Sequence, residues 1–343
     1  MDFVILALAA LLATLGLGVM RRWKRSGGRL LSYSVLVACR NEEANLPRLL
    51  ASLRAIDYPT ALIEFIIVDD ASTDGTWPLL QAFAGEVPNA RALRLTQKDP
   101  DWRGKKAALR EAAAAARHDI LLFTDADCAV PPGWPAGYND YFAPGVCFVL
   151  GFSPEERVGA FRRFTQLLSA GLLASTTGLG IPYSAIGRNM AVRRSAFEKV
   201  GGYESIKHHV SGDDKLLLEL VRRSGCTVAY NPENPVYTLP ERMVYKDQNM
   251  RRYGKFRMSR PIIQLLDVFV LAAYVWLPVR AFMGGAWPSI IIWYGATLLF
   301  WAAILVKHRQ PFHPLDPLSL AIGPYWMIVW GIRGTLGRWR WNK

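Results

Sequence analysis

Between residues 34 and 250, short apolar segments alternate with amphipathic segments, and this alternation limits the possible fold more than any other feature. It is typical of βαβ units and predicts an α/β fold with a mostly parallel sheet. The predicted strands are SVLVAC (34–39), LIEFIIVDD (62–70), ALRL (92–95), DILLFTDAD (119–127) and VCFVL (146–150), and the predicted helices lie near 43–54, 75–84 and 104–117. Ligands of such sheets bind beyond the carboxyl ends of the strands. We therefore expect a binding site near the acidic groups that end 62–70 and 119–127.

Long apolar segments flank this region. Residues 3–20 form an uncharged apolar run, which the basic cluster RRWKR at 21–25 follows directly. A signal peptide carries its positive charge before its apolar core, so we interpret residues 1–25 as an uncleaved membrane anchor whose C-terminal side is cytoplasmic. The alternative is a buried helix of a soluble protein.

The C-terminal region predicts further membrane helices at 262–283, 286–306 and 317–332. The last segment is short, and Gly323-Pro324 interrupts it. The basic groups before and after it both favour the cytoplasmic side, although a full span would separate them. We therefore expect 317–332 to be interfacial or re-entrant.

Charge and cysteine content narrow the possible partners. The 41 Lys and Arg residues exceed the 28 Asp and Glu residues by 13, which suits phosphate-bearing ligands, nucleic acid or an anionic membrane surface. The basic residues cluster beside the apolar segments, so we expect a membrane as partner and no nucleic acid.

The four cysteines form no Cys-x-x-Cys pair, and we expect a reducing compartment with neither a disulfide framework nor a zinc site. They are Cys39, Cys128, Cys147 and Cys226.

Two acidic groups follow predicted strands. Asp125 and Asp127 come after ILLF, and carboxylates at this spacing can bind one divalent cation, Mg²⁺ or Mn²⁺, together with phosphate oxygens. A solvated strand end is the alternative. Asp69 and Asp70 end another strand, where a carboxylate can accept a hydrogen bond from a nucleobase N–H. One of residues 72–74 is expected to cap the helix that follows.

Two charged groups open predicted helices. In Arg103-Gly104-Lys105-Lys106, the helix N-terminus and the lysines offer a site for a pyrophosphate, and a solvated face is the alternative. Asp213 and Asp214 begin the helix that continues as LLLELVRR. Acids in a first turn complement the helix dipole by about 0.3–1 kcal/mol each. The functional alternative is that Asp214 is a general base.

In this order and spacing, the motifs resemble those of the membrane-bound family 2 glycosyltransferases, whose catalytic domain has the GT-A fold. The resemblance runs from about residue 33 to 258 and rests on VLVACRNEEANL (35–46), VDDASTDGT (68–76), RGKKAALR (103–110), TDADC (124–128), GRNMAVRRSAFEKVGGY (187–203) and GDDKLL (212–217). It departs from the family at Arg110, where Asn is usual, and at Arg252, where the Trp of Gln-x-x-Arg-Trp is expected. The resemblance implies an α/β GT-A catalytic domain at 33–260, between the anchor at 1–25 and a C-terminal membrane region at 261–343.

The resemblance also implies an inverting transfer from a nucleotide-sugar donor, which is UDP-linked in most members. A divalent cation, Mg²⁺ or Mn²⁺, is the implied cofactor. In the implied site, Asp213 and Asp214 form the base motif, and Asp214 deprotonates the acceptor. The resemblance further implies that Asp127 and Asp125 bind the metal, that Asp70 contacts the nucleobase and that Lys105 lies near the pyrophosphate. It also implies that Asn41 and Glu42 bind the sugar donor and that Gln248 and Arg251 close over the diphosphate or the acceptor.

The acceptor is less well defined. Residues 156–175 begin with basic residues and continue as an apolar stretch, so they form either an interfacial amphipathic helix or a core helix of the catalytic domain. With membrane segments predicted at both ends, we expect a multi-pass integral membrane protein that glycosylates a lipid or lipid-linked acceptor at the cytoplasmic face. A processive polysaccharide synthase is one alternative, which Arg252 and the small membrane region oppose. A non-catalytic membrane protein that binds a nucleotide sugar is another.

Overall fold

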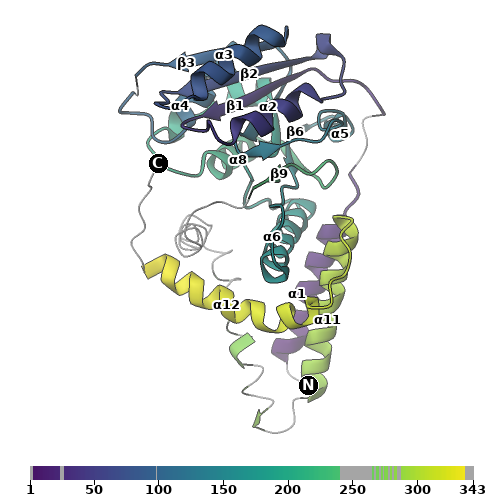
Figure 1. Ribbon diagram of the computed structural model, residues 1–343. Helices are drawn as coiled ribbons and strands as arrows, with labels where there is room; N and C mark the ends of the chain where they lie inside the picture. The colour runs from purple at the N-terminus through teal and green to yellow at the C-terminus, as the bar shows by residue number, and fades with distance from the viewer. Residues whose placement is uncertain are drawn as a thin grey trace. The chain divides into compact units, whose positions relative to one another are not determined.

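The structure is a computed structural model of the chain (Figure 1). It describes residues 3–23, 27–97, 99–239 and 287–336, together with individual positions between 265 and 283. The chain divides into two compact units. The helical unit contains residues 1–20, 157–179 and 240–343, and the α/β unit contains residues 21–156 and 180–239. The domain boundaries expected from the sequence stay predictions.

The α/β unit is built on a seven-stranded sheet with the order β3-β2-β1-β4-β7-β6-β8 (Figure 1). Its strands are β1 (Tyr33–Cys39), β2 (Ile63–Asp70), β3 (Ala90–Leu95), β4 (Ile120–Asp125), β6 (Val146–Gly151), β7 (Met190–Arg193) and β8 (Thr227–Asn231). β1 is parallel to β2 and β4, β2 is parallel to β3, and β6 is parallel to β8. β7 runs antiparallel to β4 and β6. The predicted mostly parallel α/β sheet is confirmed, but β7 lies where we predicted no strand.

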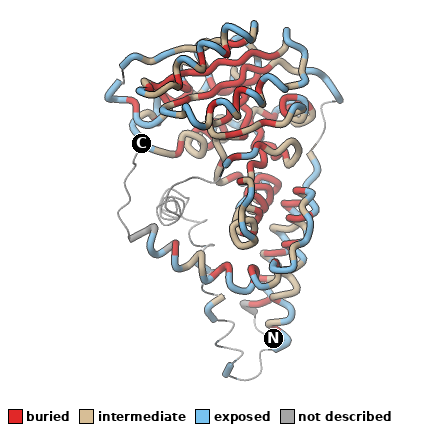
Figure 2. Tube along the Cα trace, in the orientation of Figure 1, coloured by how far each residue is buried: buried red, intermediate tan, exposed pale blue. Residues whose placement is uncertain are grey.

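The sheet forms the core because helices cover it and its strands are apolar on both faces. All eight residues of β2 and six of the seven in β1 are buried (Figure 2). Strands buried on both faces are nearly continuous apolar runs, which explains why 35–37 and 65–68 show no polar alternation. The main helices are α2 (Leu46–Arg54), α3 (Thr76–Glu86), α4 (Lys106–Ala115) and α8 (Asp213–Arg223), and the shorter ones are α5 (Ala136–Asn139), α7 (Arg194–Lys199) and the 3₁₀ turns η1 (Thr60–Leu62) and η2 (Glu204–Ile206).

A disulfide joins Cys147 in β6 to Cys226, which precedes β8, and this corrects the expectation that the cysteines form no such bond. The two residues are 79 positions apart, but β6 and β8 are neighbours in the sheet, so their Cα atoms lie 5.6 Å apart. That separation is ordinary for a disulfide. The pairing of β6 with β8 shifts register between Val146 and Phe148, where Cys147 is the unpaired extra residue. Cys39 and Cys128 are free and buried.

The helical unit contains α1 (Phe3–Met20), α6 (Ala160–Gly178), α11 (Trp287–Lys307) and α12 (Asp316–Leu336). α1 packs against α6 and α11. The hydroxyl of Ser175 in α6 donates a hydrogen bond of 2.5 Å to the backbone carbonyl of Leu15 in α1. Gly18 and Gly178 permit this close approach, because a Cβ on either would overlap the backbone of the opposite helix. These contacts and the division into units place α6 with the other apolar helices, which contradicts the alternative of a core helix of the catalytic domain; an interfacial position of 156–175 stays a prediction.

One helix among the described residues, α11, is long and apolar enough to cross a membrane. The apolar part of α1, Ile5–Met20, is shorter. α12 continues through Pro324, so Gly323-Pro324 does not interrupt it as predicted. Its first residue, Asp316, is buried and pairs with Arg163 of α6 at 3.1 Å, which fixes the start of the helix. The helix continues past Pro324 because an internal proline removes a single backbone hydrogen bond.

The described residues therefore do not support the predicted multi-pass arrangement. Most of the predicted helix at 262–283 lies outside them. The interfacial or re-entrant placement of 317–332 stays a prediction.

Candidate active site

Two turns bind each other beyond the carboxyl ends of β1 and β2. Asn41 has a φ of 52°, in the left-handed region, and its side-chain oxygen accepts the backbone N–H of Thr73 at 2.9 Å. The hydroxyl of Thr76 accepts the backbone N–H of Glu42 at 2.8 Å. The N-cap of α3 is Gly75 and not one of residues 72–74 as predicted, although Asp74 accepts the N–H of Thr76 at 3.0 Å. Asn41 and Glu42 thus shape this edge of the sheet, and their contact with a sugar donor stays a prediction.

The end of β2 carries two buried carboxylates. Asp70, which we predicted on the nucleobase, is 4% exposed. Asp69 is completely buried, accepts the N–H of Ser72 at 3.0 Å and pairs with Nε of Arg94 at 3.1 Å. The parallel register of β2 and β3 places Asp69 beside Arg94, whose guanidinium lies 5.3 Å from the ring centre of Trp77. The sequence analysis missed Arg94, although its place in the next predicted strand is a signal that could have identified it.

The second pair of carboxylates ends β4. Asp125 is the last residue of β4, and Asp127 follows two positions later. A two-stranded sheet of β5 (Cys128–Ala129) and β9 (Tyr237–Thr238) holds the chain directly after Asp127. Burial and the negative charge of Asp125 raise the pKa of the Asp127 carboxyl, and the positive charge of Arg188 opposes them. Both carboxylates are thus held at the same sheet edge as Asp70.

Asp125 and Asp127 fit a divalent cation that is shared with a ligand. Carboxylate oxygens are the ligands that hard cations prefer. The raised pKa of Asp127 means that additional positive charge would stabilise its ionised form. Within the described ranges, no group of three or more His, Cys, Asp or Glu side chains could hold a metal ion. Water and phosphate oxygens would have to complete the coordination, as is usual for Mg²⁺.

Lys105 connects the β4 carboxylates to α8. Its ammonium forms an ion pair and hydrogen bond with Asp125, and it lies 3.6 Å from Oδ2 of Asp213. Burial alone would lower the pKa of Lys105, but Asp125 and Asp213 raise it well above its usual value. The structure therefore brings together three of the predicted site residues, from β4, the start of α4 and the start of α8.

The turn before α4 packs against the segment before α8. Lys106 is almost completely buried, and its ammonium donates a hydrogen bond to the backbone carbonyl of His209. Gly104 has a φ of 68°, and a Cβ there would lie 2.8 Å from the carbonyl oxygen of Val210. Position 104 therefore requires glycine for conformation and for space.

Asp213 and Asp214 are the first two residues of α8, after Gly212 at a φ of 90°. Asp213 faces Lys105, as described above. Oδ2 of Asp214 accepts the backbone N–H of Gly187 at 3.2 Å, and Oδ1 accepts its neighbour's backbone N–H at 2.7 Å. The two acids thus have different partners, and Asp214 is the one bound to the segment predicted on the acceptor side.

Arg188 is a further residue that the sequence analysis missed as a member of the site. Its Nε donates to Oγ of Ser153 at 2.7 Å, and its terminal nitrogen donates to the backbone carbonyl of Ser153 at 3.0 Å. This anchoring holds the guanidinium where its charge acts on Asp127. The signal was its position inside the quoted motif GRNM, next to Gly187.

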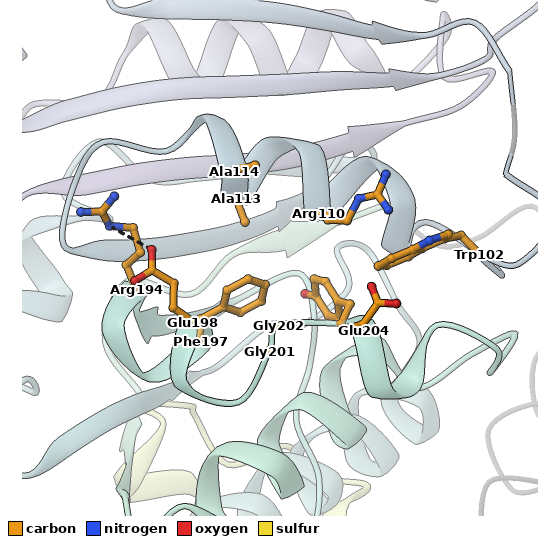
Figure 3. Close-up of a pocket in the computed structure, with 11 residues that line it drawn as sticks. Trp102, Arg110, Ala113, Ala114, Arg194, Phe197, Glu198, Gly201, Gly202 and Glu204 are labelled. Carbon is orange, nitrogen blue, oxygen red and sulfur yellow. Dashed lines mark ion pairs between the residues drawn. The ribbon is translucent and has the colours of Figure 1, made fainter.

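Gln248, Arg251 and Arg252 lie outside the described residues, and the roles assigned to the first two stay predictions. A pocket of about 280 Å³ lies between α4, α7 and the turn at 201–204, and the predicted site residues do not line it (Figure 3). Arg110 lines this pocket, and its guanidinium lies 4.3 Å from the ring centre of Trp102. Arg110, which stands where the family usually has Asn, thus packs on the Trp102 ring in this pocket.

Comparison with known sequences finds a matching family model and curated relatives. Residues 34–201 match the family model described as glycosyl transferase family 2. The probable glycosyltransferase YdaM of Bacillus subtilis is 26% identical over 216 residues, which cover 58% of this chain and 47% of the relative. The beta-monoglucosyldiacylglycerol synthase of Nostoc sp. is 34% identical over 221 residues, which cover 58% of this chain and 44% of the relative. This chain spans about half the length of these curated relatives.

Comparison with solved structures identifies the fold. The mannosyltransferase PcManGT from Pyrobaculum calidifontis, solved in complex with GDP-Man and Mn²⁺, matches with a TM-score of 0.60 and 19% identity. The match covers 97% of this chain and 98% of that chain. The predicted α/β fold of the GT-A class is confirmed.

Proposed function

The chain carries a family 2 glycosyltransferase domain, and from this we propose that it transfers a sugar from a UDP-linked nucleotide-sugar donor to a membrane-lipid or lipid-linked acceptor. The proposed transfer takes place at the cytoplasmic face and inverts the anomeric carbon. One observation carries the proposal: Lys105 joins Asp125 to Asp213. This contact brings the Asp-x-Asp pair, the lysine turn and the base motif into one site, at the edge where parallel sheets bind ligands.

In the proposed complex, the sugar donor lies across this edge. Asp70 would accept a hydrogen bond from the nucleobase. Lys105 and the N-terminus of α4 would bind the diphosphate, because the ammonium group and the partial positive charge of the helix N-terminus both attract an anion. Asp127, with Asp125, would hold Mg²⁺ or Mn²⁺, which supplies positive charge for the leaving diphosphate.

Asp214 is proposed as the general base. It would accept the proton of the acceptor hydroxyl as that oxygen attacks the anomeric carbon, while the bond from this carbon to the diphosphate breaks and the electron pair leaves with the nucleotide. A single displacement of this kind inverts the anomeric centre. The N–H of Gly187 and the N-terminus of α8 both stabilise the negative charge that a base requires. Asp213 is less suited, because it is engaged with Lys105.

The lipid acceptor is supported by two features. The Nostoc relative is named as a synthase of a glucosyl lipid. In this chain, α11 has the length and apolar composition of a membrane-spanning helix, and the apolar helices α1 and α6 pack with it. An enzyme bound to a membrane meets acceptors that are dissolved in that membrane.

The test is nucleotide release by the detergent-purified chain. A panel of UDP-linked and GDP-linked sugars is offered with Mn²⁺, Mg²⁺ or chelator, and with or without a membrane lipid extract. We expect metal-dependent release from one sugar donor, increased by lipid. Asp214→Asn should lower the rate by about 10²–10⁴-fold while leaving donor binding intact, because it removes only the proton acceptor.

Asp57→Asn provides a matched control, because it removes an exposed carboxylate from the connection between α2 and β2 and should leave the rate unchanged. Loss of donor binding in Asp214→Asn would give Asp214 a structural role instead. Equal release with soluble sugar acceptors and with lipid would contradict the lipid acceptor. Metal-dependent donor binding without any release would indicate a non-catalytic binding protein, and long products would indicate a polysaccharide synthase.

A further inference from the structure

Tyr203 is a buried tyrosine whose position is fixed from several sides. It follows Gly201 and Gly202, which have φ values of 71° and 56°, so the chain turns sharply between α7 and η2. A Cβ at Gly202 would lie 2.8 Å from the ring of Phe197, and Figure 3 shows Phe197 beside the two glycines. The Tyr203 ring packs edge-on against Phe197 with ring centres 5.3 Å apart. Only 1% of Tyr203 is exposed.

The hydroxyl of Tyr203 is buried and has no hydrogen-bond partner among the described residues. A buried polar group without a partner costs about 1–3 kcal/mol. Phenylalanine would provide the same edge-on packing against Phe197 without that cost. The packing of the ring therefore does not account for the hydroxyl.

The surroundings of the hydroxyl indicate what it can bind. After burial, the largest electrostatic effects on the Tyr203 pKa come from Asp213, which raises it, and from Lys105, which lowers it. Asp214 and Asp125 act in the same direction as Asp213. The backbone agrees with this location, because Arg103 donates its N–H to the carbonyl of Lys207 at 2.9 Å and so joins the lysine turn to the segment after Tyr203. The hydroxyl thus lies within electrostatic range of the candidate active site.

We propose that Tyr203 is a positioning residue for the proposed transfer reaction: its O–H donates a hydrogen bond to Asp213 when the sugar donor's diphosphate draws Lys105 away from that carboxylate. Lys105 is shared between Asp125 and Asp213, and an incoming diphosphate competes for the same ammonium. Asp213 would then lose its ion pair with Lys105 in a largely buried place, and Lys106, whose charge also acts on Asp213, is already engaged with the carbonyl of His209. Pairing this carboxylate with the unsatisfied hydroxyl removes both penalties at once and keeps the first turn of α8, and with it Asp214, in place.

This inference rests on the proposed function, and Tyr203→Phe tests it. Removal of an unpartnered hydroxyl should leave the melting temperature of the ligand-free protein unchanged or raise it. In the same variant, kcat should fall about 5- to 10-fold, while KM for the sugar donor changes by less than about 2-fold, since a charge-assisted hydrogen bond is lost only in the reacting complex. In an Asp213→Asn background, Tyr203→Phe should have no further effect on kcat, because the two residues act as a pair.

Tyr33→Phe is the matched control. Tyr33 is also completely buried, but its hydroxyl donates to Oδ1 of Asn139 at 2.9 Å, and it begins β1 at the sheet edge opposite the site. This variant should lower the melting temperature and leave kcat unchanged.

Three results would overturn the assignment of Tyr203. They are a kcat equal to that of the wild type, a melting temperature that falls together with kcat, and effects of Tyr203→Phe and Asp213→Asn on kcat that simply multiply. If the wild type is active, any of these results contradicts only the role assigned to Tyr203. A wild type that releases no nucleotide from any sugar donor contradicts the proposed function, and the assignment of Tyr203 falls with it.

Discussion

At the scale of residues, Lys105 balances the charge of the site, and Lys105→Met tests this. The variant leaves Asp125 and Asp213 without their shared ammonium, so we expect a loss of about 1.5–3 kcal/mol in unfolding free energy and weaker donor binding.

The pH dependence of this loss follows from the pKa of Lys105. Burial acts to lower the pKa of Lys105, but Asp125 and Asp213 raise it well above its usual value. A raised pKa contributes stability that is complete below the unfolded pKa, about 10.4 for lysine, and is lost as pH rises through the folded pKa. The difference in stability between wild type and variant should therefore be constant from about pH 7.5 to 9.5 in thermal unfolding. A difference that vanishes by about pH 9 would contradict the pairing.

At the scale of elements, the contact of α1 with α6 depends on Gly178, whose added Cβ would overlap the backbone oxygen of Gly18. Gly178→Ala must push the helices apart, and we expect it to cost about 1–3 kcal/mol of stability, measured by thermal unfolding in detergent. Gly16→Ala is the control in the same helix pair, because a Cβ at Gly16 meets nothing within 4 Å. That variant should be neutral or stabilise by up to about 1 kcal/mol, as expected for glycine to alanine in a helix. Equal effects of the two substitutions would mean that α1 and α6 do not pack through these glycines.

The elements also show what a sequence can and cannot predict. The apolar runs of β1, β2 and β4 are long and uninterrupted, so the parallel sheet and the acidic edge at Asp70 and Asp125 could be expected. β7 could not, because a strand of four residues is too short to show a periodicity. The pairing of Asp69 with Arg94 and the burial of Tyr203 within electrostatic range of Asp213 depend on contacts between segments that are distant in the sequence. α6 has an amphipathic composition that fits either unit, and its tertiary contacts with α1 decide between them.

At the scale of the whole molecule, the Cys147–Cys226 disulfide closes a covalent loop that contains both α6 and α8. In the chain-entropy account, a loop that joins residues 79 positions apart contributes about 4.5 kcal/mol by restricting the unfolded chain. We expect reductant to lower the melting temperature of the wild type and to leave that of the double variant Cys147→Ser and Cys226→Ser unchanged. Alkylation in denaturant, followed by intact mass, should then count two thiols before reduction, those of Cys39 and Cys128, and four after it. A melting temperature that does not respond to reductant would contradict a stabilising disulfide.

The same thiol count bears on the side of the membrane at which the α/β unit works. Disulfides persist in oxidising compartments and are reduced in the cytoplasm. If thiols are blocked during cell lysis, the count records the state of the chain in the cell. Four labelled thiols would agree with the cytoplasmic face proposed for the transfer reaction and would mean that the bond forms only after isolation. Two labelled thiols would mean that β6 and β8 face an oxidising compartment, which would contradict a cytoplasmic active site while leaving the arrangement of Lys105, Asp125 and Asp213 intact.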